Sequence, residues 1–334
     1  MDLLKLVQKL PSAPPIFKEE ILDKFGAKVV LPQTTFPKAS FASKRQDALG
    51  RSLPQIIAHR GNKATHPENS LRAFEDAVDA GAHALETDLH LTKDGVDRDL
   101  NRCFGVDRQI KDCDWDFIQT LRTTRMPHQP LACLRDLLQC FRRPQWQSTW
   151  LLLDVKFDDD PAALVRHIRE TFRQVDPENR IPWASKAEYI PLYSQYFPGF
   201  AIQNIGFSDF YSRHFLAVSH TSFSMIQAAL VSPRGRKFLR EVQGRDLQTF
   251  SWTNNDDINI EWCIRQGLDG IITDNVPRAL ELCETLGEEK KHRWTAKVVI
   301  GRIIFNFWLY VFILLFRRRY GTCIDEQTKV DKKK

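Results

Sequence analysis

Three short segments of the sequence carry charged side chains and histidine at the ends of apolar runs. The first, IIAHRG, ends in His59, Arg60 and Gly61. The guanidinium of Arg60 presents a planar set of donors that suits a phosphate group, and His59 can exchange protons near neutral pH. This pair indicates a phosphate site, and a surface turn with incidental polar residues is the alternative.

The second segment, LETDLH, places two carboxylates two residues apart. Alternate side chains of a β-strand share a face, so Glu86, Asp88 and His90 are expected on the same side. Neighbouring carboxylates repel one another unless a cation holds them, and oxygen ligands favour Mg²⁺ or Ca²⁺ over zinc. The spacing therefore predicts a divalent metal site, and a strand with one solvated face is the alternative.

The third segment, LLLDVK, puts Asp154 and Lys156 on one face after three leucines. Asp154 can be a third carboxylate ligand and Lys156 can face a substrate oxyanion, while an ion pair between the two is the structural alternative. Trp252, in SWTNND, offers a flat apolar wall to a glycerol or acyl-proximal group, and Asp274, in GIITDN, is expected to cap a helix. Together these residues predict metal-assisted hydrolysis of a phosphodiester.

The elements that position these residues alternate between strand-like and helix-like runs. Such alternation predicts a parallel sheet, and about eight units in about 235 residues suit a TIM (β/α)8 barrel. A doubly wound open sheet is the alternative, but the chain lacks a glycine-rich dinucleotide fingerprint. The predicted strands are 55–58, 83–91, 149–157, 182–187, 200–207, 220–224, 247–252 and 270–273.

Composition divides the chain into five regions. We expect a poorly ordered N-terminal extension, the barrel, a charged linker, a hydrophobic segment and a basic tail, at 1–53, 54–287, 288–297, 298–316 and 317–334. The hydrophobic segment has no polar face, which favours a tail anchor or a shallow interfacial insertion over a helix packed on the barrel.

Charge and cysteine usage predict where the protein works. The formal net charge is +6, with many basic residues near the C-terminus and no zinc-finger or RNA-binding motif. An anionic membrane surface is therefore a better partner than nucleic acid. The seven cysteines form no CxxC pair, and the N-terminus lacks the pattern of a signal peptide. We expect a membrane-associated protein with a cytosol-facing barrel, without a choice between endoplasmic reticulum, lipid droplet and mitochondrion.

The same segments carry a resemblance to a known family. HRGNKATHPENSLRAFEDAVDAGAHALETDLHLTKDG resembles the N-terminal signature of the glycerophosphodiester phosphodiesterase family, with HRG, PENS, ETD and TKDG in order. LLLDVKF, FSWTNND and GLDGIITDNVPRALELC are similar to later blocks of the family. The resemblance extends over about residues 54–285. The LLLDVKF form and the hydrophobic tail look most like the fungal phosphatidylglycerol phospholipase C branch, which is membrane-associated.

This resemblance implies a fold, a cofactor and site residues. The fold is a TIM barrel of the phospholipase C-like phosphodiesterase type, and the cofactor is a divalent metal, Mg²⁺ or Ca²⁺. The implied roles are acid–base catalysis by His59, phosphate contacts from Arg60 and Lys156, and metal ligands at Glu86, Asp88 and Asp154.

One segment departs from the family. After the Lys93-Asp94-Gly95 turn, the family has a third strand ending in His-Asp, and that histidine is the second member of the catalytic pair. Here DGV continues directly into DRDLNRCFG. We expect a truncated third barrel strand and irregular backbone at residues 96–98. A stretch missing from the recorded sequence, a real deletion in a binding-only relative, and a substitute acid such as His90 or His66 are the three explanations.

Three functional hypotheses follow. The first is a phospholipase C that converts phosphatidylglycerol to diacylglycerol and glycerol phosphate at a membrane. The second keeps the chemistry but acts on water-soluble glycerophosphodiesters, and a tail folded onto the barrel would favour it. The third is a non-catalytic phospholipid-binding protein, which the missing histidine after Gly95 favours.

Overall fold

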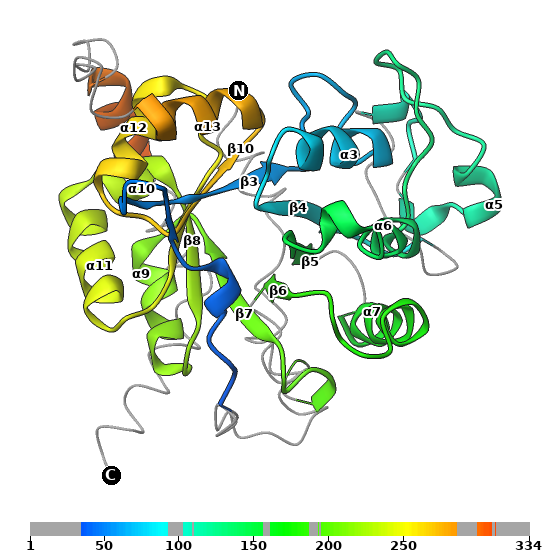
Figure 1. Ribbon diagram of the computed structural model, residues 1–334, viewed down its shortest axis with the longest axis horizontal. Coiled ribbons are helices and arrows are strands. Elements are labelled where there is room, and N and C mark those ends of the chain that lie inside the picture. Colours follow the sequence, from blue (N-terminus) through cyan, green and yellow to red (C-terminus); the bar gives the residue numbers. More distant parts are fainter. Residues whose placement is uncertain are drawn as a thin grey trace. The chain divides into compact units, whose positions relative to one another are not determined.

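A closed barrel of parallel strands forms the centre of the fold (Figure 1). The computed structural model describes residues 35–92, 103–108, 110–155, 161–186, 193, 195–285, 299–308 and 311. The barrel order is β10-β3-β4-β5-β6-β7-β8-β9, so the first and last barrel strands pair with each other. Its strands are β3 (Gln55–His59), β4 (Ala84–Leu89), β5 (Trp150–Val155), β6 (Trp183–Lys186), β7 (Ala201–Gly206), β8 (Ser222–Ile226), β9 (Thr249–Trp252) and β10 (Gly270–Thr273).

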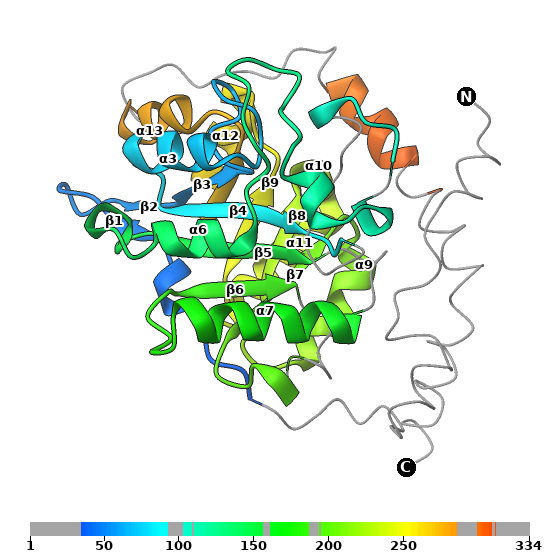
Figure 2. The same ribbon diagram turned by 90° about the vertical axis from the view of Figure 1, so that its right-hand side faces the viewer.

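Helices cover the outside of the barrel, and Figure 2 shows α3, α6 and α7 lying along its strands. In α3, the apolar residues Ala73, Phe74 and Ala77 are buried, and the Ser70 hydroxyl accepts the first-turn N–H of Ala73. Within the described part of residues 35–285 lie the helices α3 (Leu71–Asp79), α5 (Trp115–Ile118), α6 (Leu134–Cys140), α7 (Pro161–Val175), α9 (Asp209–Ser212), α10 (Gln227–Val231), α11 (Pro233–Gly244), α12 (Asp257–Arg265) and α13 (Val276–Thr285), with 3₁₀ turns η2 (Ser40–Ala42), η3 (Ile110–Asp112), η4 (Pro144–Trp146) and η6 (Arg213–Ala217).

The prediction of a (β/α)8 barrel is confirmed, but the expected loss of its third strand is wrong. β4 pairs directly with β5 along a continuous register from Ala84↔Trp150 to Leu89↔Val155. The eight strands therefore close without a contribution from the segment after Gly95, and the barrel gains no free edge there. Residues 96–98, which we expected to be irregular, lie outside the described residues.

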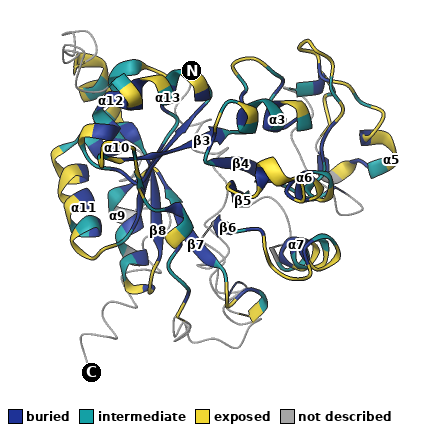
Figure 3. Ribbon diagram, viewed as in Figure 1, coloured by how far each residue is buried: buried dark blue, intermediate teal, exposed yellow. Residues whose placement is uncertain are grey.

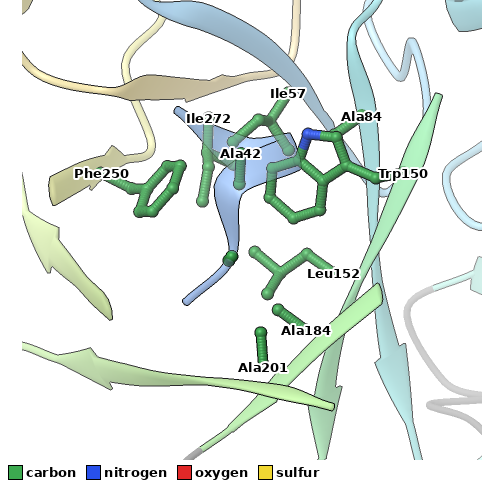
Figure 4. Packing of buried hydrophobic residues seen from close by; sticks show 10 residues of the cluster. Ala42, Ile57, Ala84, Trp150, Leu152, Ala184, Ala201, Phe250 and Ile272 are labelled. Atoms are coloured by element: carbon green, nitrogen blue, oxygen red, sulfur yellow. The ribbon is translucent and has the colours of Figure 1, made fainter. Parts of the chain in front are cut away.

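Residues 35–53 were placed by the sequence in a poorly ordered extension, but they are ordered. β1 (Arg45–Gln46) and β2 (Ser52–Leu53) form a small antiparallel pair. Ala39 and Ala42 join the apolar cluster inside the barrel, which Figure 4 shows around Trp150 and Phe250. This segment therefore plugs the amino-terminal end of the barrel. Residues 1–34 of the predicted extension lie outside the described residues.

The barrel interior has an apolar layer below a charged layer. Along β4, the inward positions are Ala84, Glu86 and Asp88, and along β5 they begin with Trp150 and Leu152 and end with Asp154. Ala84, Trp150 and Leu152, which lie nearer the amino-terminal end of the barrel, belong to the apolar cluster. Figure 3 shows the strands largely buried and the helices with exposed outer faces. The same alternation therefore builds the core and delivers the carboxylates.

Residues 299–308 are helical and carry large exposed apolar side chains, including Ile303, Phe307 and Trp308. They are the main described part of the predicted membrane segment 298–316. Within the described residues, no helix combines the length and apolar character needed to cross a bilayer. The predicted boundaries of the linker, the hydrophobic segment and the basic tail stay predictions.

Candidate active site

Three carboxylates converge at the carboxyl ends of β4 and β5. Ligand oxygens of Glu86, Asp88 and Asp154 all lie within 4.8 Å of one another. Asp88 and Asp154 are direct register partners, and alternation in β4 brings Glu86 to the same face. Glu86 and Asp88 are 4% and 6% exposed. Three carboxylates in so small and buried a volume repel strongly, and an all-oxygen donor set fits Mg²⁺ or Ca²⁺.

Arg60 is the cation that balances part of this charge. Its Nε lies 2.8 Å from Asp88 Oδ2, and its Nη1 donates to Glu68 Oε1 at 2.8 Å. Its backbone N–H also donates to Glu86 Oε2 at 3.1 Å. Burial alone would lower the pKa of Arg60, but the charges of Asp88, Glu86 and Glu68 outweigh burial and raise it. Arg60 is thus a permanently charged group beside the carboxylate cluster.

The backbone of the HRG motif turns sharply to place Arg60. Arg60 and Gly61 adopt φ values of +59° and +82°, in the left-handed region. A Cβ on Gly61 would lie 2.7 Å from the carbonyl carbon of Ala73 in α3. Glycine is therefore needed both for its dihedral angle and for this close approach.

His59 lies at the end of β3, between the carboxylate cluster and the last barrel strand. Its Nδ1 lies 2.7 Å from Asp274 Oδ1, and its Nε2 lies 3.9 Å from Glu86 Oε2. Because an ionised carboxylate only accepts, Nδ1 carries the proton in this pair. Nε2 is then the nitrogen that faces the cluster and can exchange a proton with a substrate.

Asp274 is held in this orientation from both sides. Asn255 donates to Asp274 Oδ2 at 2.7 Å and accepts the Asp274 backbone N–H at 2.8 Å. Lys63 Nζ lies 3.3 Å from Asp274 Oδ1. Burial alone would raise the pKa of Asp274, but the hydrogen bond and charge of His59, with Lys63 and Asn255, hold it below its ordinary value. Asp274 therefore stays ionised and orients the His59 ring.

The expected helix-capping role of Asp274 belongs to its neighbour. The Asn275 side chain accepts the backbone N–H of Arg278 at the start of α13, at 3.2 Å. Asp274 instead contacts His59, because barrel closure places β10 beside β3. A search for polar residues at the ends of the first and last strands could have found this pair.

The sequence also missed Glu68, Lys63 and Asn255 as parts of the site. Glu68 belongs to the PENS segment and reaches Arg60, while Lys63 lies in the same connection after β3. Asn255 follows β9 in the SWTNND block. Their type and position after strand ends were visible, but their partners depend on how the connecting segments fold back.

The remaining predicted residues have mixed outcomes. Trp252 ends β9 half-buried, and its Nε1–H donates to the Ser224 carbonyl at 3.1 Å. Lys156 lies outside the described residues. His66 contacts Thr65 and lies 3.5 Å from Asp76 on α3. His90 follows the end of β4 and is half-buried.

A barrel that gathers carboxylates, an arginine and a histidine at the carboxyl ends of its strands is the arrangement expected of an enzyme that acts on phosphate esters. The chain belongs to the glycerophosphoryl diester phosphodiesterase family, whose model matches residues 59–197 and 201–278. These ranges include every residue of the site described above. The family resemblance predicted from the sequence is therefore confirmed.

Two curated relatives illustrate the match. Glycerophosphodiester phosphodiesterase domain-containing protein 4 of Macaca fascicularis is 27% identical over 273 residues, covering 67% of this chain and 40% of the relative. A lysophospholipase D of Homo sapiens is 40% identical over 152 residues, covering 40% of this chain and 46% of the relative. The chain thus spans less than half the length of each. These relatives do not single out the fungal phosphatidylglycerol phospholipase C branch.

Solved structures share the fold. A glycerophosphodiester phosphodiesterase from Parabacteroides distasonis superposes with a TM-score of 0.59 at 21% identity, covering 71% of this chain and 99% of that one. An Oleispira antarctica phosphodiesterase in complex with the product sn-glycerol-3-phosphate gives 0.58 at 19% identity, covering 70% and 97%. At these identities the likeness concerns the barrel alone.

Proposed function

We propose that this protein is a metal-dependent phosphodiester hydrolase of glycerophospholipids. Phosphatidylglycerol is the substrate, and diacylglycerol and glycerol phosphate are the products. The observation that carries the proposal is the mouth of the barrel, where ligand oxygens of three carboxylates lie within 4.8 Å of one another and two of the three, Glu86 and Asp88, contact Arg60. A buried acidic cluster with an adjoining arginine and histidine suits an anionic diester whose charge must be balanced during cleavage.

The residues divide the work. Glu86, Asp88 and Asp154 hold the cation. When bound, a divalent cation supplies positive charge to the phosphodiester oxygens. Arg60 provides a second, fixed positive charge, and Lys156 is proposed for the same role because the alternation in LLLDVK predicts that it shares a face with Asp154. Trp252 forms an apolar wall for the glycerol or acyl-proximal part of the substrate.

His59 is the proposed general base. With its Nδ1 proton directed to Asp274, its Nε2 can take the proton of the headgroup 2-hydroxyl or of water. The deprotonated oxygen bonds to phosphorus, the bond from phosphorus to the diacylglycerol oxygen breaks, and that oxygen takes a proton from solvent. After attack by the 2-hydroxyl, water opens the cyclic phosphate to glycerol phosphate. Asp274 stabilises the imidazolium that this transfer creates, and Asn255 keeps the carboxylate aligned. Orientation by a buried hydrogen-bonded carboxylate is how a histidine is kept in one tautomer.

We also propose that the protein works on a membrane surface, with the barrel in the cytosol. The support is the run of exposed apolar side chains on residues 299–308, followed in the sequence by three arginines at 317–319. Apolar insertion combined with basic flanks is the usual basis of interfacial binding.

The test is product analysis with the full chain and vesicles containing phosphatidylglycerol, in MgCl₂ or CaCl₂ and in EDTA. Metal-dependent release of diacylglycerol and glycerol phosphate is expected. His59→Ala should lower the rate about 10²–10⁴-fold. His167→Ala, on the solvent-exposed side of α7, is the matched histidine control and should not change it.

Other results would select a different function. Phosphatidic acid and free glycerol would indicate cleavage on the other side of the phosphorus, as the name of the human relative suggests for that protein. Turnover of soluble glycerophosphodiesters alone would favour the water-soluble substrate class. Metal-dependent vesicle binding without turnover would favour a non-catalytic phospholipid-binding protein, the alternative that the missing histidine after Gly95 suggests.

A further inference from the structure

A pocket of about 150 Å³ adjoins the proposed catalytic residues. Lys63 and Glu68, from the connection after β3, line one part of it, and Thr123, Thr124 and Arg125 line another. Lys63 and Glu68 are also contacts of Asp274 and Arg60. The pocket therefore lies next to the groups that would hold and cleave the diester, with space for a polar group of a few heavy atoms.

The charges of the lining residues favour one kind of occupant. Lys63 and Arg125 are both cationic. Glu68 is the single carboxylate among the described lining residues, and it already forms a 2.8 Å ion pair with Arg60. Its negative charge is thus offset by an arginine outside the lining. The described lining residues thus carry a net positive charge, which disfavours a cationic occupant relative to a neutral one.

The lysine is held in place by its neighbours. Arg125 donates from Nη1 to the carbonyls of Lys63 and His66, and from Nη2 to the carbonyl of Ala64. These three bonds tie the 123–125 segment to the connection after β3. Lys63 Nζ also lies 3.9 Å from Glu68 Oε2 and 3.3 Å from Asp274 Oδ1. Its charge therefore has a defined position between the pocket and His59's partner.

We propose that this pocket binds the headgroup of the substrate and that Lys63 selects headgroups without positive charge, such as glycerol, against choline-type headgroups. This inference rests on the proposed function. The Thr124 hydroxyl donates to the Cys103 carbonyl at 3.3 Å and can still accept a hydrogen bond, which suits a hydroxylated headgroup. Lys63 acts here by charge, as a specificity-determining residue.

The test compares glycerophosphoglycerol with glycerophosphocholine, which differ in headgroup charge. Their dissociation constants are measured by calorimetry in CaCl₂ on the full chain carrying His59→Ala, so that turnover does not interfere. Lys63→Gln and Lys63→Glu are added to this background. Lys237→Glu on α11 is exposed and matches the change in net charge.

We expect the lysine form to prefer glycerophosphoglycerol by about tenfold, Lys63→Gln to narrow the ratio and Lys63→Glu to reverse it. Lys237→Glu should keep the original ratio. The ratio is used because damage to folding or to Asp274 changes both affinities together. Equal affinities, a preference for the choline diester, a ratio indifferent to Lys63, or binding of neither diester would each overturn the inference.

The proposed hydrolase function is tested independently of the headgroup pocket. Its test is turnover by the chain with His59 intact, measured on the same two diesters and on phosphatidylglycerol vesicles. A protein that hydrolyses them but shows no headgroup preference contradicts only the pocket inference. A protein that selects the headgroup by Lys63 yet hydrolyses nothing supports the pocket and contradicts the hydrolase.

Discussion

The two ends of the barrel interior are built from the same strands and have opposite physical character. At the amino-terminal end, Trp150 and Leu152 of β5 pack with Phe250 and the plug residue Ala42. At the carboxyl end of the same strand, Asp154 meets two further carboxylates. The amino-terminal end stabilises the fold by removing apolar surface from water, while the carboxyl end brings together like charges that repel one another. The residues that stabilise the barrel and the residues of the candidate site are therefore only two positions apart along β5.

The largest expected effect is on catalysis, at the charged end. Asp154→Asn should lower the proposed turnover by about 10³-fold or more, because the proposed metal site loses one of its three carboxylates. The metal-free variant should be at least as stable as the original chain, since one of three mutually repelling charges is gone. Activity assays and thermal melts with and without CaCl₂ measure both effects. Undiminished turnover, or an unchanged rise of Tm with metal, would contradict the ligand role.

At the apolar end, the same kind of truncation should act on stability instead. Leu152 is fully buried, and Leu152→Ala should lower the free energy of unfolding by about 2–5 kcal/mol. Urea unfolding measures the loss. The specific activity of the folded fraction and the stabilisation by metal should both persist. Loss of metal-induced stabilisation in this variant would show that the two ends are not separate.

The two ends should also differ in how they respond to acid. At the amino-terminal end, burial and the charge of Arg45 lower the pKa of His83 from 6.5 to about 4, and its Nδ1 accepts the Ile56 N–H at 3.0 Å. The unfolded chain binds a proton at His83 more readily than the folded chain does. The stability that neutral His83 contributes to the fold is therefore fully present above pH 6.5 and is lost as the pH falls towards 4. The loss amounts to about 3.5 kcal/mol at most, at about 1.4 kcal/mol per pKa unit.

Asp274, at the charged end, behaves in the other window. Its pKa lies below the ordinary 3.8, so the stability it contributes is present above pH 3.8 and is lost only as pH falls below that value. Chemical unfolding between pH 7 and pH 3.5 separates the two. His83→Gln should flatten the curve between pH 6.5 and 4, and a curve that keeps its slope would show that another group is responsible.

The smallest effect concerns the alignment of the charged end. Asn255→Ala removes two hydrogen bonds to Asp274 without touching the carboxylate cluster. A loss of about tenfold in kcat/KM is expected, with most of it in kcat, because Asp274 then holds the His59 ring less firmly. Steady-state kinetics measure it. A change in KM alone would place Asn255 in substrate binding instead.

Local patterns in the sequence predicted much of this arrangement. Alternation along LETDLH put Glu86 and Asp88 on one face, and the strand order that a barrel requires brought Asp154 to them. Each predicted strand overlaps an observed one, because parallel barrel strands are apolar runs between polar connections. These features depend on neighbours in the sequence or on a repeated unit.

Contacts between distant segments were harder to predict. Asp274 was expected to cap a helix, because nothing near it in the sequence points to His59. Residues 35–53 contain proline and many polar side chains, a composition that predicts poor order. The burial of Ala39 and Ala42 inside the barrel could therefore not be predicted from this segment alone. The strand expected after Gly95 was counted as a barrel strand. Whether a run belongs to the barrel depends on its hydrogen-bond pairing, and β4 pairs directly with β5.

That direct pairing makes the connection from β4 to β5 an excursion from an already complete barrel. The chain leaves the ladder at Leu89 and re-enters it at Trp150. Insertions and deletions in between are expected to alter the surface over the site while the eight strands keep their register. Such a connection tolerates changes in length during evolution, and grafting a relative's connection here would replace Thr123, Thr124 and Arg125 of the pocket lining while the barrel strands stay unchanged.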